Sequence, residues 1–274
     1  MAREVTDPYN IEELTVSLNG LGYQFQYTSE TSSTMRQAEE HVLEGGSLPA
    51  IFLTDHQTQG IGREGRKWLD KSGNSVLVSQ VNRIKPDTTP SYMDLVALHV
   101  CRTIREVTGV DKAQIKYPND LVIEDEKFGG ILIINILQEG SYVATNTGIG
   151  INVHYSKQDL EDYPTDYGAT ALDLYTPRIN RRVGLVLALM GGLKFTPADA
   201  QIFSTNNQYR QDYNNIWRGV SSVYGRIVQV ETEEGVLVRG KVADTQIGQG
   251  VLIEDAWGSK WFNHFDTRMK VRVN

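Results

Sequence analysis

Three apolar runs separated by short polar segments constrain the fold of this chain more than any other feature. The runs are 121–124, 130–138 and 142–149, and apolar and polar residues alternate along them as they do in strands. The segments between them, 124–127 and 138–141, have the length of tight turns and carry acidic residues and glycine. The sequence therefore predicts an antiparallel meander.

The same patterns predict the elements around this meander. Alternation indicates further strands at 23–28, 50–54 and 75–81, and helical spacing lies between them. Ser33 is a plausible N-cap for a helix. The predicted helices are 34–43, 91–107, 181–193 and 197–213. This mixture predicts an α+β fold, a mixed and mainly antiparallel sheet flanked by helices.

The pattern changes after Trp217. Short alternating runs at 226–231, 236–243, 250–254 and 260–262 are separated by glycine-bearing turns. We interpret them as a separate small β-barrel. The predicted domains are 1–220 and 221–274.

Charge and cysteine content exclude several classes of protein. With 27 Lys+Arg against 34 Asp+Glu, the net charge of −7 argues against general affinity for nucleic acid or an anionic membrane. The longest apolar stretches, 130–137 and 183–193, are shorter than the roughly 20 residues of a membrane span. The single cysteine, Cys101, allows no intrachain disulfide, and a reducing cytoplasm is the expected location.

The segment 57–68 is the most unusual in the chain. It carries three glycines, which permit close approach of a ligand, and three cations, which attract negative charge. Its glycines satisfy the dinucleotide pattern G-x-G-x-x-G, but no apolar helix follows, so we reject a nucleotide fold of that type. A solvated surface loop is the alternative interpretation of this segment alone.

Three other segments place polar groups or glycines at the ends of predicted elements. The box Lys116-Tyr117-Pro118-Asn119-Asp120, followed by Lys127, frames a polar pocket or forms an ordinary turn. In 148–152 glycines alternate along a strand, which leaves a gap above the sheet or marks a bulge. The hydroxyls of 32–34 either bind a ligand or only cap a helix.

Taken in order, these segments resemble the biotin–protein ligase family, and the resemblance runs from Ser32 to the C-terminus. That family carries a Ser-Thr-Asn turn, a glycine/arginine loop ending in Arg-x-Trp, a Lys-Trp-Pro-Asn-Asp box, a Lys-x-x-Gly-Ile-Leu strand and a Gly-x-Gly-Ile-Asn strand. All five are recognisable here. The resemblance implies a biotin ligase catalytic domain, similar to class II synthetases, followed by a small SH3-like β-barrel.

The resemblance also implies the site residues. Those implied for biotin are Ser33, Thr34, Met35, Gln57, Ile61, Gly62, Arg63 and Lys127. Those implied for the nucleotide are Arg63, Trp68, Asn119, Asp120 and Asn152, and the catalytic candidates are Lys127, Arg63 and Asp120. No residue is assigned to a metal. Three positions depart from the family pattern: Met35 replaces asparagine, Ile61 a basic residue and Tyr117 tryptophan.

The implied activity is ATP-dependent formation of biotinyl-5′-AMP and transfer of biotin to a lysine of the biotin carrier domain of a carboxylase. ATP and biotin are then substrates, Mg²⁺ assists at the phosphates, and a homodimer is a further expectation. The alternatives are a lipoate–protein ligase and a non-catalytic biotin-binding regulator. A bifunctional repressor is not expected, because only about thirty residues precede Ser33, too few for a DNA-binding module.

Overall fold

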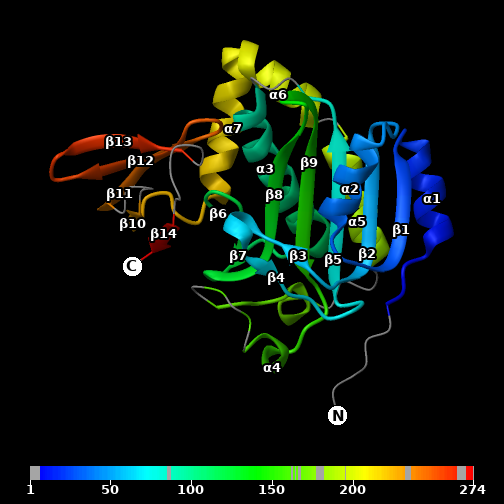
Figure 1. Ribbon diagram of the computed structural model, residues 1–274. Coiled ribbons are helices and arrows are strands. Elements are labelled where there is room, and N and C mark those ends of the chain that lie inside the picture. Colours follow the sequence, from blue (N-terminus) through cyan, green and yellow to red (C-terminus); the bar gives the residue numbers. More distant parts are fainter. Residues whose placement is uncertain are drawn as a thin grey trace.

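The chain is built around one large sheet, shown in Figure 1. The computed structural model describes residues 7–84, 88–161, 163, 165, 168–176, 182–194, 196–231, 236–263 and 270–273. Seven strands form the sheet in the order β1-β2-β5-β9-β8-β7-β6. Each neighbouring pair is antiparallel except β1–β2, which is parallel. The strands are β1 (Gln24–Thr31), β2 (Ala50–Gln57), β5 (Ser75–Asn82), β6 (Ala113–Lys116), β7 (Asp120–Ile123), β8 (Glu126–Gln138) and β9 (Ser141–Asn152).

The predicted central meander is confirmed. β7, β8 and β9 are consecutive antiparallel strands joined by two-residue turns. In the first turn Glu124 and Asp125 have φ of 52° and 68°, and in the second Glu139 and Gly140 have φ of 52° and 78°. Positive φ at both central residues matches the right-handed twist of the flanking strands, so these turns fix the register of the meander.

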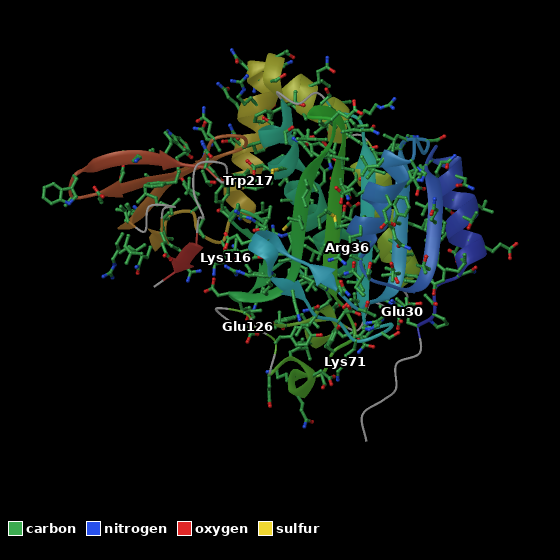
Figure 2. The ribbon with its side chains drawn as sticks, viewed as in Figure 1. Glu30, Arg36, Lys71, Lys116, Glu126 and Trp217 are labelled. Atoms are coloured by element: carbon green, nitrogen blue, oxygen red, sulfur yellow. The ribbon has the colours of Figure 1, made fainter. Side chains whose placement is uncertain are left out.

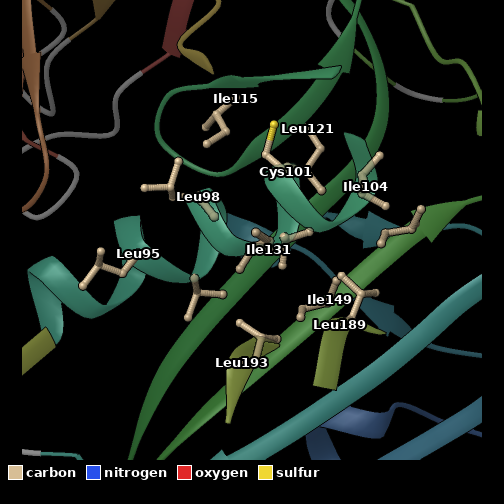
Figure 3. Packing of buried hydrophobic residues seen from close by; sticks show 14 of the residues in the cluster. Leu95, Leu98, Cys101, Ile104, Ile115, Leu121, Ile131, Ile149, Leu189 and Leu193 are labelled. Atoms are coloured by element: carbon tan, nitrogen blue, oxygen red, sulfur yellow. The ribbon is translucent and has the colours of Figure 1, made fainter. Parts of the chain in front are cut away.

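Helices cover both faces of the sheet. α1 (Ile11–Gly20), α3 (Thr89–Thr108) and α5 (Arg182–Leu193) pack on one face and form the main apolar core with it. Figure 3 shows α3 side chains such as Leu98 and Cys101 packed against Ile131 and Ile149 of the sheet. α2 (Thr34–Leu43) lies on the opposite face over a smaller apolar cluster. Burial raises the pKa of the Cys101 thiol to about 11, as expected for a structural cysteine.

The helices after α5 differ from the prediction. The expected single helix 197–213 is wrong, because α6 (Thr196–Thr205) and α7 (Asn207–Val220) are separate. Asn206 stands between them with extended backbone, and its side chain accepts a hydrogen bond from Tyr209 N at 3.0 Å. Asparagine is a favoured N-cap, so it starts a new helix where the apolar spacing alone indicated continuity. The short α4 (Lys157–Leu160) and the helix α1 were not predicted.

A second, five-stranded antiparallel sheet follows α7, in the order β13-β12-β11-β10-β14. Its strands are β10 (Ile227–Glu231), β11 (Leu237–Gln246), β12 (Gly250–Asp255), β13 (Gly258–Phe262) and β14 (Lys270–Val273). The side chain of Trp217 in α7 is buried against it and donates to Thr245 Oγ1 at 2.8 Å. The small C-terminal β unit is therefore confirmed, whereas its boundary at residue 220 stays a prediction.

One stretch of the described chain, Arg182–Thr205, is long and apolar enough to cross a membrane by length and composition alone. It includes α5, in which Leu185, Leu189 and Met190 are buried in the main core. Burial of this kind is the ordinary behaviour of a core helix, since a helix that is apolar all round must be covered.

Candidate functional site

Glycines at the middle of the sheet let side chains from outside the sheet lie directly against it. Gly130 of β8 pairs with Gly150 of β9, and Gly148 lies two residues along β9. A Cβ on Gly150 would lie 2.6 Å from the Trp68 ring, and one on Gly148 would lie 2.5 Å from Met35 Sδ. Only glycine permits this approach, so the alternating glycines of 148–152 serve close packing on the sheet and are not a bulge.

The glycine/arginine loop, residues 57–68, lies over these glycines. It follows β2 and contains a small hairpin of β3 (Gly60–Ile61) and β4 (Lys67–Trp68), closed by a 3-10 turn at Arg63–Gly65. Gly62 N donates to Arg66 O at 2.7 Å across the hairpin. Figure 2 labels Arg36 on α2, whose Nη1 donates to Gln59 Oε1 at 2.6 Å and so ties the loop to that helix. The segment is therefore a hairpin on the protein surface, with residues 58, 59 and 64–67 exposed.

The first turn of α2 supplies buried hydroxyls. Ser33 caps the helix by accepting a hydrogen bond from Met35 N at 3.2 Å. Thr34 donates from both N and Oγ1 to Gln57 Oε1, at 2.9 and 3.2 Å. Ser79 of β5 donates to Thr34 Oγ1 at 2.8 Å. Capping and a polar cluster therefore coexist here, and the structure joins Thr34 to Gln57, 23 residues away.

Lys127 stands at a β-bulge. The register between β7 and β8 shifts so that Leu121 pairs with Gly129 and Val122 with Lys127, which leaves Phe128 as the extra residue. The Lys127 Nζ atom lies 2.5 Å from Asp120 Oδ1 and 5.8 Å from the centre of the Trp68 ring. The bulge thus brings a cation, a carboxylate and an aromatic ring together beside the glycines.

Two asparagines complete the polar side of the site. Asn119 holds the sheet through Nδ2, which donates to Ile131 O at 2.9 Å, and its Oδ1 accepts from Arg63 Nη1 at 3.2 Å. Asn152 Nδ2 donates to Thr170 O at 3.2 Å. Among the described residues the buried Asn152 Oδ1 has no hydrogen-bond partner. A buried carbonyl oxygen in this condition is suited to accept a ligand donor or a hard cation.

The structure therefore brings the predicted residues into two linked groups. Thr34 and Gln57 form one with α2, and Lys127, Asp120 and Trp68 form the other. Arg63 connects the loop to the proline box through Asn119, whereas Ile61 and Gly62 form the hairpin that carries Arg63. Met35 covers Gly148, and Asn146 Nδ2 donates to its carbonyl oxygen at 2.8 Å.

Sequence reasoning missed two residues at the base of the loop. Asp70 Oδ2 accepts from His56 Nδ1 at 2.8 Å, and Asp70 Oδ1 accepts from Gln57 N at 3.2 Å. Burial raises the pKa of Asp70, although the hydrogen bonds from His56 and Gln57 oppose this effect. A histidine and an aspartate 14 residues apart have no recognisable spacing, and only the closed loop reveals the pair.

The segments that form this site are similar to those of a known family. Residues 27–153, which include all of the site segments described above, match the model of the biotin/lipoate A/B protein ligase family. This part of the chain is similar to that family. By its description, that family includes both biotin and lipoate ligases.

Individual relatives show the same similarity. The chain is 31% identical over 165 residues to the bifunctional ligase/repressor BirA of Bacillus subtilis (strain 168), covering 59% of this chain and 50% of the relative. It therefore spans about half the length of that protein. It is 26% identical over 244 residues to the biotin--[acetyl-CoA-carboxylase] ligase of Mycobacterium tuberculosis, covering 86% of this chain and 84% of the relative.

The fold is shared with solved members. The biotin protein ligase of Aquifex aeolicus in complex with biotin and ATP superimposes with a TM-score of 0.74 at 21% identity. The alignment covers 92% of this chain and 99% of that one. Because it extends past α7, the alignment includes residues of the C-terminal sheet as well as the large sheet, in agreement with the expected SH3-like unit.

Proposed function

We propose that this protein is a biotin–protein ligase that activates biotin with ATP and transfers it to a lysine of the biotin carrier domain of a carboxylase. The observation that carries the proposal is the meeting of Lys127, Asp120 and Trp68 over the glycines of β8 and β9. The similarity of residues 27–153 to the biotin/lipoate A/B protein ligase family and the named activities of the relatives support the same conclusion.

In the first half-reaction a carboxylate oxygen of biotin attacks the α-phosphorus of ATP, and the bond to pyrophosphate breaks. Negative charge gathers on the α-phosphate and on the leaving group. Lys127 and Arg63 are cations held by neutral or acidic oxygens, Asp120 and Asn119, so phosphate oxygens can take over those contacts. These two residues position the reactants and offset charge, and neither has to transfer a proton.

Mg²⁺ would neutralise the triphosphate, and Asn152 and Asp120 would hold it together with phosphate oxygens. The Asn152 Oδ1 atom fits this role, because it is a buried hard ligand without a hydrogen-bond partner in the described part of the chain. No group of three or more His, Cys, Asp or Glu side chains among the described residues could hold a metal on its own. The cation is therefore expected to arrive with the nucleotide.

In the second half-reaction the ε-amine of the acceptor lysine attacks the biotinyl carbonyl, an amide bond forms and AMP leaves. The amine must lose a proton to attack, and Asp120, the carboxylate paired with Lys127, is the candidate to accept it. Water must be kept away from the mixed anhydride meanwhile. The glycine/arginine loop suits this task, because its hairpin already lies across the glycines and is tied to α2.

The test is incubation of the purified protein with ATP, Mg²⁺ and labelled biotin, with and without a biotin carrier domain. The unaltered chain is expected to form adenylate and label the carrier. Lys127→Ala is expected to lower adenylate formation at least 100-fold, since electrostatic transition-state contacts are typically worth ~10²–10³ in rate. Asp120→Asn, supplied with preformed adenylate, is expected to transfer biotin more slowly.

Two outcomes contradict the proposal in different ways. Lipoate accepted in place of biotin would assign the chain to the other branch of the family. Biotin bound without any adenylate would indicate a regulator that has lost turnover. A matched lipoate competition therefore belongs in the same assay, and equal rates for Lys127→Ala and the unaltered chain would remove the lysine from the mechanism.

Homodimer formation is a further proposal, and the open edge of β8 supports it. β7 pairs with β8 only between Glu126 and Gly130, so residues 132–138 have β9 as their one partner strand within the described sheet. Ile134 and Leu137 are exposed along this segment. An unpaired strand with apolar residues favours pairing with a second chain. Sedimentation equilibrium would decide, and a monomer at all concentrations would contradict it.

A further inference from the structure

The base of the glycine/arginine loop is closed by one buried carboxylate. The Asp70 side chain has no exposed surface. Its Oδ1 accepts from Gln57 N at 3.2 Å and its Oδ2 accepts from His56 Nδ1 at 2.8 Å. Because His56 and Gln57 end β2 and Asp70 follows β4, this carboxylate joins the two ends of the loop.

Gln57 passes this constraint to α2. Its main-chain N–H is fixed by Asp70, while its side-chain Oε1 accepts two hydrogen bonds from Thr34. Gln57 therefore stands between a fixed loop base and the first turn of α2. If the Gln57 backbone moved away from Asp70, Oε1 would move away from Thr34, because the Gln57 side chain is only long enough to reach Thr34 from its present position.

We infer that Asp70 is a positioning residue for biotin activation, which holds Gln57 at the biotin site and keeps the glycine/arginine loop closed over the adenylate; this rests on the proposed function. A loop anchored at its base loses less conformational entropy when it orders over a ligand, so the anchor contributes to affinity. Asp70 acts through Gln57 and His56 and does not touch the reactants itself.

Burying the Asp70 carboxylate costs free energy, and this favours a specific role for it. A buried charge without partners is strongly unfavourable, and both oxygens of Asp70 are satisfied by groups from the same two residues at the other end of the loop. Two acceptors on one rigid group hold two successive residues, His56 and Gln57, in fixed orientation. A hydrophobic side chain would fill the space but leave Gln57 N without an acceptor.

The decisive comparison is between Asp70→Ala and Asp70→Asn. Alanine removes both acceptors. Asparagine keeps Oδ1 for Gln57 N, and its Nδ2 can donate to His56 Nδ1 in the other tautomer. Asp111→Ala is the matched control, because it removes an exposed carboxylate from the turn before β6. Thermal unfolding is measured on each variant so that general destabilisation is separated from misplacement of the loop.

Two measurements on the active protein test the inference. Asp70→Ala is expected to raise the KM for biotin about tenfold with a smaller change in kcat, the size of one lost hydrogen bond to a charged acceptor. It is also expected to release more AMP for each biotin transferred, because water reaches the adenylate. Asp70→Asn is expected to stay within about threefold of the unaltered chain in both respects.

Trypsin cleavage within the loop gives a readout that needs no activity. Arg63, Arg66 and Lys67 are its cleavage sites there. Asp70→Ala is expected to be cut at these positions about tenfold faster than the unaltered chain, and Asp70→Asn at nearly the same rate, since cleavage follows the open population. If Asp70→Ala does not fold, His56→Ala removes one partner of the carboxylate and is expected to show the same changes at about threefold.

The outcomes separate this inference from the proposed function. If the unaltered chain forms no adenylate, the proposed function is contradicted. The trypsin cleavage rates still test whether Asp70 holds the loop closed. Equal KM, AMP release and cleavage in Asp70→Ala and the unaltered chain would overturn the inference, whatever the change in thermal stability. So would an Asp70→Asn variant as impaired as Asp70→Ala, because acceptor geometry would then not be what Asp70 supplies.

Discussion

Gly150 is the residue on which Trp68 lies. A Cβ at this position would meet three atoms of the Trp68 ring at 2.6, 2.7 and 3.0 Å. Gly150→Ala is therefore expected to push the ring off β9 and away from Lys127, raising the KM for ATP about tenfold or more. The cost in unfolding free energy should be about 1–3 kcal/mol, as for other overpacked sites.

The matched control for this prediction is Gly191→Ala in α5, where an added Cβ meets nothing within 4 Å. Steady-state kinetics with varied ATP, together with urea unfolding, check both variants. An unchanged KM for ATP in Gly150→Ala would show that the position of Trp68 is irrelevant to the nucleotide. Gly191→Ala should leave kinetics unchanged and stability equal or slightly higher, because alanine favours helix.

At the scale of residues, sequence predicted the members of the site better than their partners. The motif around Lys127 identified it as a candidate, but its contact with Trp68 depends on the bulge at Phe128, which has no sequence signature. The acceptor for Arg63, Asn119, is 56 residues away. Asp70 was missed altogether, because its function arises only when the loop closes.

At the scale of elements, the contact between α3 and the C-terminal sheet contains a titratable group. Asp94 of α3 is buried, its Oδ2 accepts from Gly248 N at 2.7 Å, and its Oδ1 has no partner within the described chain. Burial raises the pKa of Asp94 to about 7, with the hydrogen bond from Gly248 opposing the shift. The folded protein therefore binds a proton more tightly than the unfolded chain at this residue.

The sign of the pH dependence follows from this difference. Asp94 contributes stability that is complete below its unfolded pKa, 3.8, and that is lost as the pH rises through about 7. The loss is at most about 4 kcal/mol, since one pKa unit corresponds to about 1.4 kcal/mol. Asp94→Asn keeps an acceptor for Gly248 N without the charge, so it should be more stable than the unaltered chain at pH 8.

Urea unfolding at pH 5 and pH 8 measures this effect. The unaltered chain should lose stability from Asp94 between these values, and Asp94→Asn should lose less. Asp111→Asn, at an exposed carboxylate, should leave the pH dependence unchanged. If the unfolding free energies of Asp94→Asn and the unaltered chain change with pH in the same way, ionisation of Asp94 costs little. Groups that do not bond to Asp94 in this structure would then stabilise its charge.

Elements were predicted where the local pattern was long and regular. The helix at Thr34–Leu43 was predicted at its observed bounds, because Ser33 marks its start. The four-residue β6 and the parallel partnership of β1 with β2 were not predicted. A short strand has too few residues for alternation to show, and strand pairing depends on contacts between distant segments.

At the scale of the whole molecule, one buried arginine joins segments from four parts of the chain. Arg182, at the start of α5, is 1% exposed. Its Nη1 donates to Ser75 O at 2.9 Å, and its Nη2 donates to Asp55 Oδ1 at 2.7 Å and to Asp7 O at 2.6 Å. Its guanidinium also lies 4.1 Å from the centre of the Tyr9 ring. No local pattern predicts this cluster, since each partner is more than 100 residues away.

This cluster connects global stability to the site, because Asp55 immediately precedes His56 and Gln57 on β2. Arg182→Met fills the space but leaves Asp55 without its cation and Asp7 with only the His154 ring beside it, so it should cost about 3–5 kcal/mol of unfolding free energy. Arg182→Lys keeps the charge without the planar fork, so its unfolding free energy should lie between those of Arg182→Met and the unaltered chain. Arg182→Met should also disturb the glycine/arginine loop, which would appear as faster trypsin cleavage at Arg63.

Urea unfolding of both variants, beside Arg102→Met at an exposed position of α3, provides the measurement. A loss below about 1 kcal/mol in Arg182→Met would mean that the carboxylates relax into water and that the cluster does not organise the end of β2. If Arg182→Met loses the expected amount of about 3–5 kcal/mol but its loop is cleaved at the unchanged rate, Asp70 holds the loop independently of Arg182. The loop base would then be stabilised locally, and the arginine would join only the core elements.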